Sequence, residues 1–169
     1  KIKREKGDFI SAFAPYGYNK SEENKNKLVI DEQAAPNIKN IFDMKLLGYS
    51  SKAIADELNH LGVLTPRKYK ESQGFKCNGF QNIKGGNWSA KAVNRIIENE
   101  VYIGNILQGK SITLNYKNKK QIGKDKEEWI RVENTHEAIV SKEVFSIANT
   151  MLKRDLNNSR GKDKIEIFT

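Results

Sequence analysis

Two short amphipathic segments, each bounded by its own start and stop signals, place the strongest constraint on the fold. The first is expected to begin after Asp31, a good N-cap, and to stop at Gly48. The second is expected to begin at Ser50 or Ser51 and to stop at Gly62. Apolar residues recur at helical spacing in both, so each helix has one face to bury. The expected buried positions are Ala35, Ile38, Ile41, Phe42 and Leu46 in the first helix and Ile54, Ala55, Leu58 and Leu61 in the second.

A third amphipathic helix is expected to follow a long connection. Trp88 and Ser89 precede this helix, with Ser89 as its N-cap, and it is expected to end near Asn99. Residues 67–87 contain four glycines, so we expect a long irregular loop there. Because this connection far exceeds the usual turn, the helix pair is expected to be helix-turn-helix-like at most. The third helix would bury Val93, Ile96 and Ile97 and would expose Lys91, Asn94, Arg95 and Glu98.

The other segments predict short strands and one further helix. Pro15 disfavours a helix before it, so residues 9–18 are expected to form an extended arm or short strands. A polar turn then precedes a strand at 28–30. Ser141 would cap a last helix that has an apolar face. Further strands are expected at 101–107, 111–116 and 129–132, forming a β-hairpin with a basic tip at 117–127. We therefore predict an α+β fold with about four helices, a helix-turn-helix-like core, short N-terminal strands and a basic β-hairpin.

Positive charge is segregated along the chain. The 169 residues carry a formal net charge of +9. Residues 28–62 hold three basic and five acidic residues, whereas residues 67–95 hold seven basic residues and one acidic residue. A second basic block, residues 110–131, holds seven basic and three acidic residues. Segregation of this kind is typical of a surface that meets a polyanion, most often nucleic acid.

Other classes of function find little support in the sequence. No stretch approaches the roughly 18 consecutive apolar residues of a membrane span, and we expect no secretory leader. Cys77 is the only cysteine, which excludes an internal disulfide and, with two histidines, a zinc finger. We expect His60 to be solvated and His136 to make a local hydrogen bond. No catalytic residue, metal site or cofactor is expected, and the protein is expected to be cytoplasmic.

The third helix is the strongest candidate for contact with DNA. Arg95 and Asn94 have the side chains that pair with guanine and adenine edges, and Ser89 lies at a helix N-terminus that can hold a phosphate. We expect Arg67, Lys68 and Lys70 to contact phosphates near the start of this helix. Tyr16 and Tyr18 are candidates too, although we favour a packing role for both. The full set of candidates is Tyr16, Tyr18, Arg67, Lys68, Lys70, Ser89, Lys91, Asn94, Arg95, Lys110, Lys117 and Lys119.

An ordered set of short motifs gives the chain a family resemblance over about residues 7–152. The motifs are Gly7-x-Phe9, Ala14-Pro15-Tyr16-Gly17-Tyr18, Leu28-Val29-Ile30-Asp31-Glu32, Ile41-Phe42, Gly48-x-Ser50, Ile54-Ala55-x-x-Leu58-Asn59-x-x-Gly62-Val63-x-Thr65-Pro66, Trp88-Ser89, Val93-x-x-Ile96-Ile97-x-Asn99, Val101-Tyr102-Ile103-Gly104 and Asn134-Thr135-His136-Glu137-Ala138-Ile139-Val140. With this set the chain resembles the "recombinase" DNA-binding domain of large serine recombinases, the transposon and phage integrases. The loop 67–87 departs from the compact family form and looks like the clostridial conjugative-transposon subgroup.

The resemblance implies an organisation and an activity for a longer protein. Residues 1–6 would end a helix that leads from a resolvase-like domain with the nucleophilic serine, residues 7–154 would form the DNA-binding domain, and residues 155–169 would lead toward a zinc ribbon. In such proteins the serine attacks DNA phosphodiesters and forms 5′-phosphoserine links. The subunits then rotate, and the DNA strands are religated. This chain would then be a non-enzymatic part that recognises attachment half-sites of a mobile element, together with other recombinase subunits.

Two other classes of function stay open at this point. Basicity alone also permits an RNA-binding module, which a comparison of duplex DNA with duplex RNA would separate. A stand-alone DNA nuclease is the other alternative, and a cleavage assay with added Mg²⁺ would separate that. We expect no cleavage, and we expect this chain to be monomeric in isolation.

Overall fold

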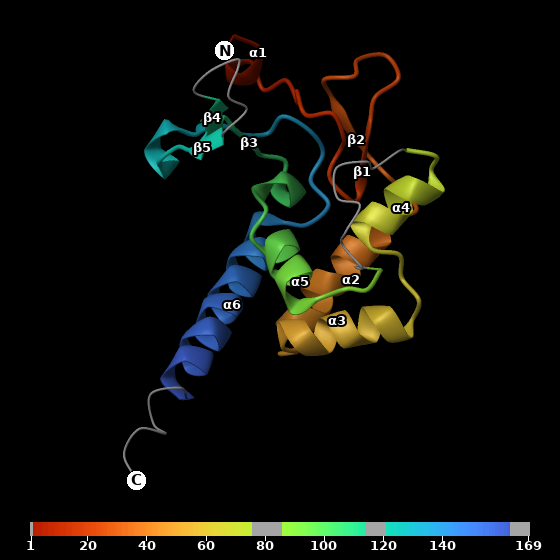
Figure 1. Ribbon diagram of the computed structural model, residues 1–169, viewed down its shortest axis with the longest axis vertical. Coiled ribbons are helices and arrows are strands. Elements are labelled where there is room, and N and C mark those ends of the chain that lie inside the picture. Colours follow the sequence, from red (N-terminus) through yellow and green to blue (C-terminus); the bar gives the residue numbers. More distant parts are fainter. Residues whose placement is uncertain (1, 76–85, 114–120, 163–169) are drawn as a thin grey trace. The chain divides into compact units, whose positions relative to one another are not determined.

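The computed structural model describes residues 2–75, 86–113 and 121–162 (Figure 1). The chain forms two compact units, each built from two separate stretches of sequence. Unit 1 comprises residues 1–35 and 100–139, and unit 2 comprises residues 36–99 and 140–169. Helices and short antiparallel strands are both present, so the predicted α+β class is confirmed.

In the described part of unit 1 the strands form three separate two-stranded antiparallel ladders. The first pairs β1 (Tyr18–Lys20) with β2 (Leu28–Ile30), as expected from the polar turn between them. The second pairs β3 (Ile106–Gln108) with β6 (Ile130–Val132), and the third pairs β4 (Ser111–Thr113) with β5 (Gln121–Gly123). The other elements of unit 1 are α1 (Ile2–Glu5) and the short 3₁₀ helices η1 (Glu100–Ile103) and η2 (Lys126–Glu128).

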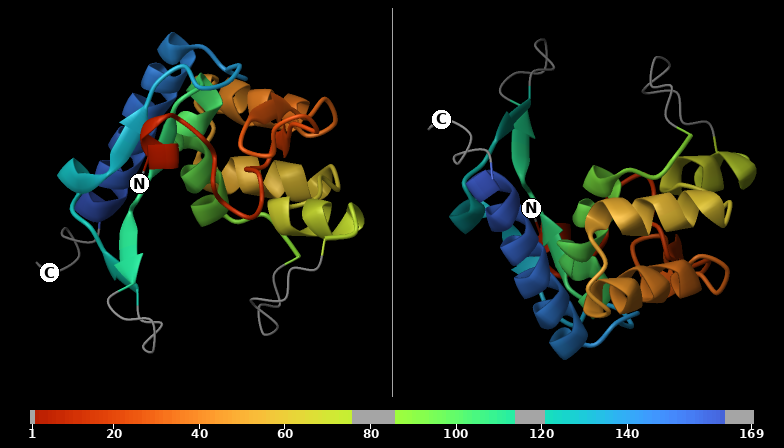
Figure 2. Two further views of the ribbon diagram at one scale, coloured as in Figure 1. Left: turned by 90° about the horizontal axis from the view of Figure 1, so that it is seen from above. Right: turned by 90° about the horizontal axis from the view of Figure 1, so that it is seen from below.

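Unit 2 is helical. Its elements are α2 (Ala35–Leu46, which starts at the boundary between the units), α3 (Ser51–His60), α4 (Pro66–Ser72), α5 (Ala90–Ile97) and α6 (Lys142–Lys162). Figure 2 shows α3 and α5 side by side, and these two helices pack closely. Most of the apolar positions predicted from the sequence are buried, with Ile38, Ile54 and Val93 fully inaccessible to solvent. Leu61, which was expected to be buried, is 57% exposed, because it lies at the C-cap of α3 where the helix ends. The core of unit 2 therefore forms where the helical stripes meet.

The helix ends follow the predicted local signals. Side-chain oxygens of Ser50, Ser89 and Ser141 accept hydrogen bonds from the backbone N–H groups three residues later, at 3.2, 3.3 and 3.3 Å. Gly48 and Gly62 have φ values of +91° and +68°, the left-handed conformation that ends a helix. These predictions are confirmed because capping depends on neighbouring residues alone.

Four predicted elements differ from the structure. One is the basic tip expected at 117–127, because residues 121–123 form the strand β5, which pairs with β4. Part of the irregular loop expected at 67–87 is the helix α4, because Thr65 caps it and Pro66 occupies its first turn, where a missing N–H costs nothing. Residues 100–103 form a 3₁₀ helix and only 106–108 form a strand, so the strand expected at 101–107 was wrong in its first half. The last helix continues to residue 162, into the segment 155–169 that was expected to lead out of the DNA-binding domain.

An ion pair inside unit 2 accompanies that longer helix. Lys45 on α2 is 1% exposed, and its ammonium group pairs with the carboxylate of Asp155 on α6. Lys45 also donates a hydrogen bond to the carbonyl oxygen of Tyr49 at 3.3 Å. The ring of Phe42 packs against that of Phe145, with 6.1 Å between centroids. Together these contacts hold α6 against α2. Within the described residues, no helix is long and apolar enough to span a membrane.

Candidate functional site

Helix α5 is fixed at its start by a pair of hydrogen bonds from α3. The Asn59 side chain accepts a hydrogen bond from the backbone N–H of Trp88 at 2.7 Å and donates one to the Trp88 carbonyl oxygen at 3.0 Å. The indole N–H of Trp88 donates to the carbonyl oxygen of Val63 at 2.9 Å. The residue just before the Ser89 cap is thus tied to α3 and to the chain that follows it, so the direction of α5 is set by its neighbours.

The two faces of α5 differ as the sequence predicts, except at Asn94, which was expected to be exposed. Val93, Ile96 and Ile97 are buried, whereas Lys91 and Arg95 are exposed. Asn94 is only half-buried, and its Oδ1 atom is enclosed without a hydrogen-bond partner among the described residues. The two cations therefore project from the helix, while Asn94 is partly withdrawn into the protein.

Helix α4 brings one further cation close to the start of α5. The ammonium end of Lys68 lies so close to Gly86 that a side chain at position 86 would collide with it. Gly86 lies three residues before the Ser89 cap. Lys68 is exposed, so it stands near the N-terminal end of α5, as the sequence predicts for the cations that follow Pro66.

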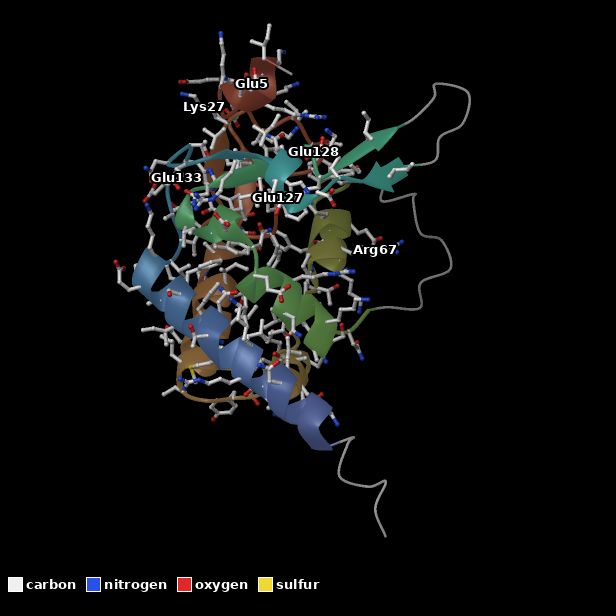
Figure 3. The ribbon with its side chains drawn as sticks, turned by 90° about the vertical axis from the view of Figure 1, so that its left-hand side faces the viewer. Glu5, Lys27, Arg67, Glu127, Glu128 and Glu133 are labelled. Atoms are coloured by element: carbon white, nitrogen blue, oxygen red, sulfur yellow. The ribbon has the colours of Figure 1, made fainter. Side chains whose placement is uncertain are left out.

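The other two cations predicted on this segment are engaged within the protein. Arg67 forms an ion pair with Glu71, with 2.8 Å between Nε and Oε1, and Figure 3 shows Arg67 on α4. Lys70 is buried: its ammonium group donates to the Gln73 amide oxygen at 3.3 Å and lies 5.5 Å from the centroid of the Phe75 ring. The prediction that Lys70 contacts a phosphate does not fit this burial, because α4 turns that side of the helix inward.

The basic hairpin of unit 1 is described in part. Lys110 lies with its ammonium group 4.8 Å from the centroid of the Trp129 ring, a cation–π contact. Lys124 pairs with Glu128 at 3.2 Å. Lys117 and Lys119, both predicted to contact DNA, lie outside the described residues.

Tyr16 and Tyr18 belong to the core of unit 1. Both are buried, and the Tyr18 hydroxyl lies within donating distance of the carbonyl oxygens of Val101 (3.2 Å) and Glu137 (2.9 Å). The Tyr102 hydroxyl donates to the carbonyl oxygen of Tyr16 at 3.0 Å. Burial raises the pKa of the Tyr18 phenol well above its usual value. The packing role favoured for both tyrosines is confirmed, and their inclusion among the DNA contacts is not supported by this burial.

Both histidines lie as the sequence predicts. His60 is exposed, as expected. His136 lies between Thr135, whose hydroxyl is 2.7 Å from Nδ1, and the Val101 carbonyl oxygen, 2.8 Å from Nε2. Burial lowers the pKa of this imidazole. Cys77 lies outside the described residues, and within those residues no cluster of acidic, histidine or cysteine side chains fits a metal ion.

Two positioning residues escaped prediction from the sequence. Asn59, described above, fixes the start of α5. Gln108 is buried and holds the N-terminal arm of unit 1: its amide group donates to the Asp8 carbonyl oxygen at 2.8 Å and accepts from the Ile10 N–H at 3.2 Å. Both bond to backbone far away in sequence. Asn59 belongs to the motif set quoted above, but nothing in the sequence says which backbone groups either side chain would hold.

Comparison with known proteins agrees with this architecture. The Recombinase family model matches residues 32–155. A chain from a crystal structure of an LSR–DNA complex is 19% identical with a TM-score of 0.55, and the match covers 90% of this chain and 37% of that chain. A chain from work on the sequence requirements of the Listeria innocua prophage attP site is 20% identical with a TM-score of 0.49, covering 90% and 49%.

This chain spans less than half the length of either solved chain. The first of the two similarities shows a shared fold. The family match extends over most of the chain, including every helix described above except α1 and the last residues of α6. On this basis, and as its motifs led us to expect, the chain belongs to the Recombinase family.

Proposed function

We propose that this chain recognises double-stranded DNA at the attachment half-sites of a mobile element, as part of a serine site-specific recombinase. The observation that carries the proposal is the outward face of α5, where Lys91 and Arg95 are exposed on a helix whose start is tied to α3 through Asn59. A helix whose buried face packs against the protein in this way can enter the major groove and present its exposed side chains to base edges.

Charge and similarity support the same conclusion. Lys68 adds a cation near the start of α5, within a segment of seven basic residues and one acidic residue. The relative with the same fold was crystallised with DNA. We propose that Lys68 and Lys91 contact phosphates, which attract any sequence, and that Arg95 contacts base edges, which differ between sequences. The Oδ1 atom of Asn94 is enclosed, so only the exposed part of this side chain could contact a base.

We further propose that strand cleavage is not performed by this chain. Its role is recognition, in a bacterial cytoplasm and together with other subunits of the longer recombinase. A reaction with supercoiled DNA and Mg²⁺ should then leave the DNA intact. This part of the proposal would be overturned if the wild-type chain cleaved the DNA and a variant of the chain did not, because the cleavage would then belong to this chain.

Two matched variants test the role of α5. Arg95→Ala should weaken binding to the specific duplex by about 1–3 kcal/mol and weaken binding to a random duplex much less. Lys91→Ala should weaken both duplexes by about the same factor, because a phosphate contact carries no sequence information. The measurement is a pair of titrations at one fixed salt concentration, with the specific site taken from footprints on the ends of the protein's own element.

The outcome that would refute the assignment is equal weakening of both duplexes by Arg95→Ala. Lys52→Ala is the control for loss of an exposed charge, because Lys52 is exposed on α3 within the acidic segment. It should leave both affinities close to those of the wild type. A duplex RNA of the same sequence serves as a further arm, and tighter binding to RNA than to DNA would overturn the proposal.

A further inference from the structure

The β4·β5 ribbon of unit 1 carries an exposed apolar pair. Ile112 and Ile122 are direct partners in its register, so both side chains lie on the same face of the ribbon. They are 49% and 41% exposed. A two-stranded ribbon of three residues per strand gains little from an apolar pair that stays in water. The pair is therefore available to a partner.

Two adjacent hollows lie at the base of this ribbon, within unit 1. One, of about 380 Å³, is lined by Ile112 and Ile130 together with Arg4 and Lys124. The other, of about 330 Å³, is lined by Arg4, Ser11 and Lys110. Arg4 and Gly109 line both hollows. The base of the ribbon thus combines apolar walls with cationic ones.

The cations of these hollows differ in their availability. Lys124 is paired with Glu128, which lines the larger hollow and lies beside the ribbon (Figure 3). Lys110 lies over the Trp129 ring, a contact that leaves its charge intact. Arg4 is half-buried between the two hollows and has no ion pair with any residue that the structure describes. Its guanidinium is the cation best placed to receive an anion.

We propose that this face of unit 1 is a second DNA contact, in which Arg4 and Lys110 hold phosphates and the Ile112–Ile122 pair lies in the minor groove. The inference rests on the function proposed above. A DNA strand alternates anionic phosphates with apolar deoxyribose edges, which matches cations beside isoleucines. Proteins that bind the minor groove combine basic side chains with apolar ones in this way.

The chemistry of the pair favours the minor groove over the major groove. Ribbons that read the major groove do so with side chains that donate or accept hydrogen bonds. Isoleucine offers no such group, so this face cannot distinguish base edges there, and it contributes affinity rather than sequence choice. The cations around the pair also favour a polyanion over an apolar protein surface.

Three variants of the full chain test the proposal. Arg4→Ala should lower the magnitude of the slope of log K against log salt by about 0.9, as expected for the loss of one phosphate contact. The double variant Ile112→Thr/Ile122→Thr should bind specific and random duplexes at least about tenfold more weakly, with an unchanged salt slope. Threonine keeps the β-branched shape that suits a strand, so the ribbon is retained. Ile147→Thr, at a 53% exposed position of α6, is the matched control and should bind as the wild type does.

A minor-groove ligand completes the test. A netropsin-type ligand at saturating concentration should weaken wild-type binding several-fold and should weaken the double variant no further. A melting curve for each variant confirms that it is folded. Wild-type affinity for the double variant, or a wild-type salt slope for Arg4→Ala, would overturn the proposal. Either result leaves duplex binding by the wild type intact, whereas failure of the proposed function would appear as no duplex binding by the wild type.

Discussion

Asn59 offers the sharpest test of how the fold positions α5. The substitution Asn59→Ala removes both side-chain hydrogen bonds to the Trp88 backbone, at 2.7 and 3.0 Å. A neutral hydrogen bond contributes about 0.5–1.5 kcal/mol net, and a buried group that loses its partner costs about 1–3 kcal/mol. Trp88 is 4% exposed, so water cannot easily replace the lost partners. We therefore expect a loss of about 2–3 kcal/mol in the free energy of unfolding.

The assay is urea unfolding followed by far-UV circular dichroism, together with amide hydrogen exchange of α5. A loss of this size corresponds to a fall in melting temperature of about 4–10 °C for a chain of this length. Asn59→Asp keeps an oxygen to accept from the Trp88 N–H and loses only the donated bond, so its loss should be smaller. Asn157→Ala, at an exposed position of α6, is the control and should change stability by less than about 0.5 kcal/mol.

The exchange measurement shows where the loss acts. In the Asn59→Ala variant, exchange of amide hydrogens in the first turn of α5 should speed up more, relative to the wild type, than exchange in α6. The reason is that both hydrogen bonds removed by the substitution lie at the start of α5. The reasoning would be refuted if Asn59→Ala matched Asn157→Ala in both stability and exchange. It would also be refuted if Asn59→Asp were as unstable as Asn59→Ala, since the two bonds would then not contribute separately.

Two further predictions concern the core of unit 1. Gly104 has φ +83° and an added Cβ would lie 2.7 Å from the His136 carbonyl oxygen, so Gly104→Ala should cost more than about 2 kcal/mol in a melting experiment. Gly74→Ala shares the positive φ, at +84°, with no atom near its Cβ, and should cost less; equal losses would exclude the steric clash. Burial lowers the pKa of His136, so the unfolded chain binds more protons as pH falls below about 6.5, and stability should fall by at most about 1.4 kcal/mol per pH unit there. His136→Gln should lessen that dependence relative to His60→Gln between pH 5 and 7, and an identical pH dependence of the two variants would contradict the prediction.

Features that depend on neighbouring residues could be predicted from the sequence. The caps at Ser50, Ser89 and Ser141 are confirmed because a cap needs only its own side chain and the N–H three residues later. The helix α4 carries an equally local signal, Thr65 followed by Pro66. The glycines from Gly74 onward favour an irregular loop, so the loop predicted over 67–87 was wrong where α4 forms.

Features that depend on distant partners could not be predicted. Lys70 and Lys68 belong to the same basic run, and nothing in their spacing alone says that one is buried against Phe75 while the other stays exposed. The structure separates them because α4 has an inner and an outer face. Charge in the sequence therefore predicts which segment would face a polyanion, whereas the structure is needed to separate its exposed cations from its buried ones.

The same reasoning applies to the hairpin of unit 1 and leads to its proposed role. The sequence predicts a basic hairpin, and its alternation alone leaves open which residues lie opposite one another. The register pairs Ile112 with Ile122, and that pairing gathers two isoleucines on one exposed face. A shift of one strand by one residue would place Ile112 opposite Gln121 or Gly123 and would divide the apolar pair. The combination of an apolar pair with Arg4 thus depends on the strand register and on the position of α1 in unit 1. Simple attraction of lysines to phosphates would not need the isoleucines, whereas the proposed contact in the minor groove does.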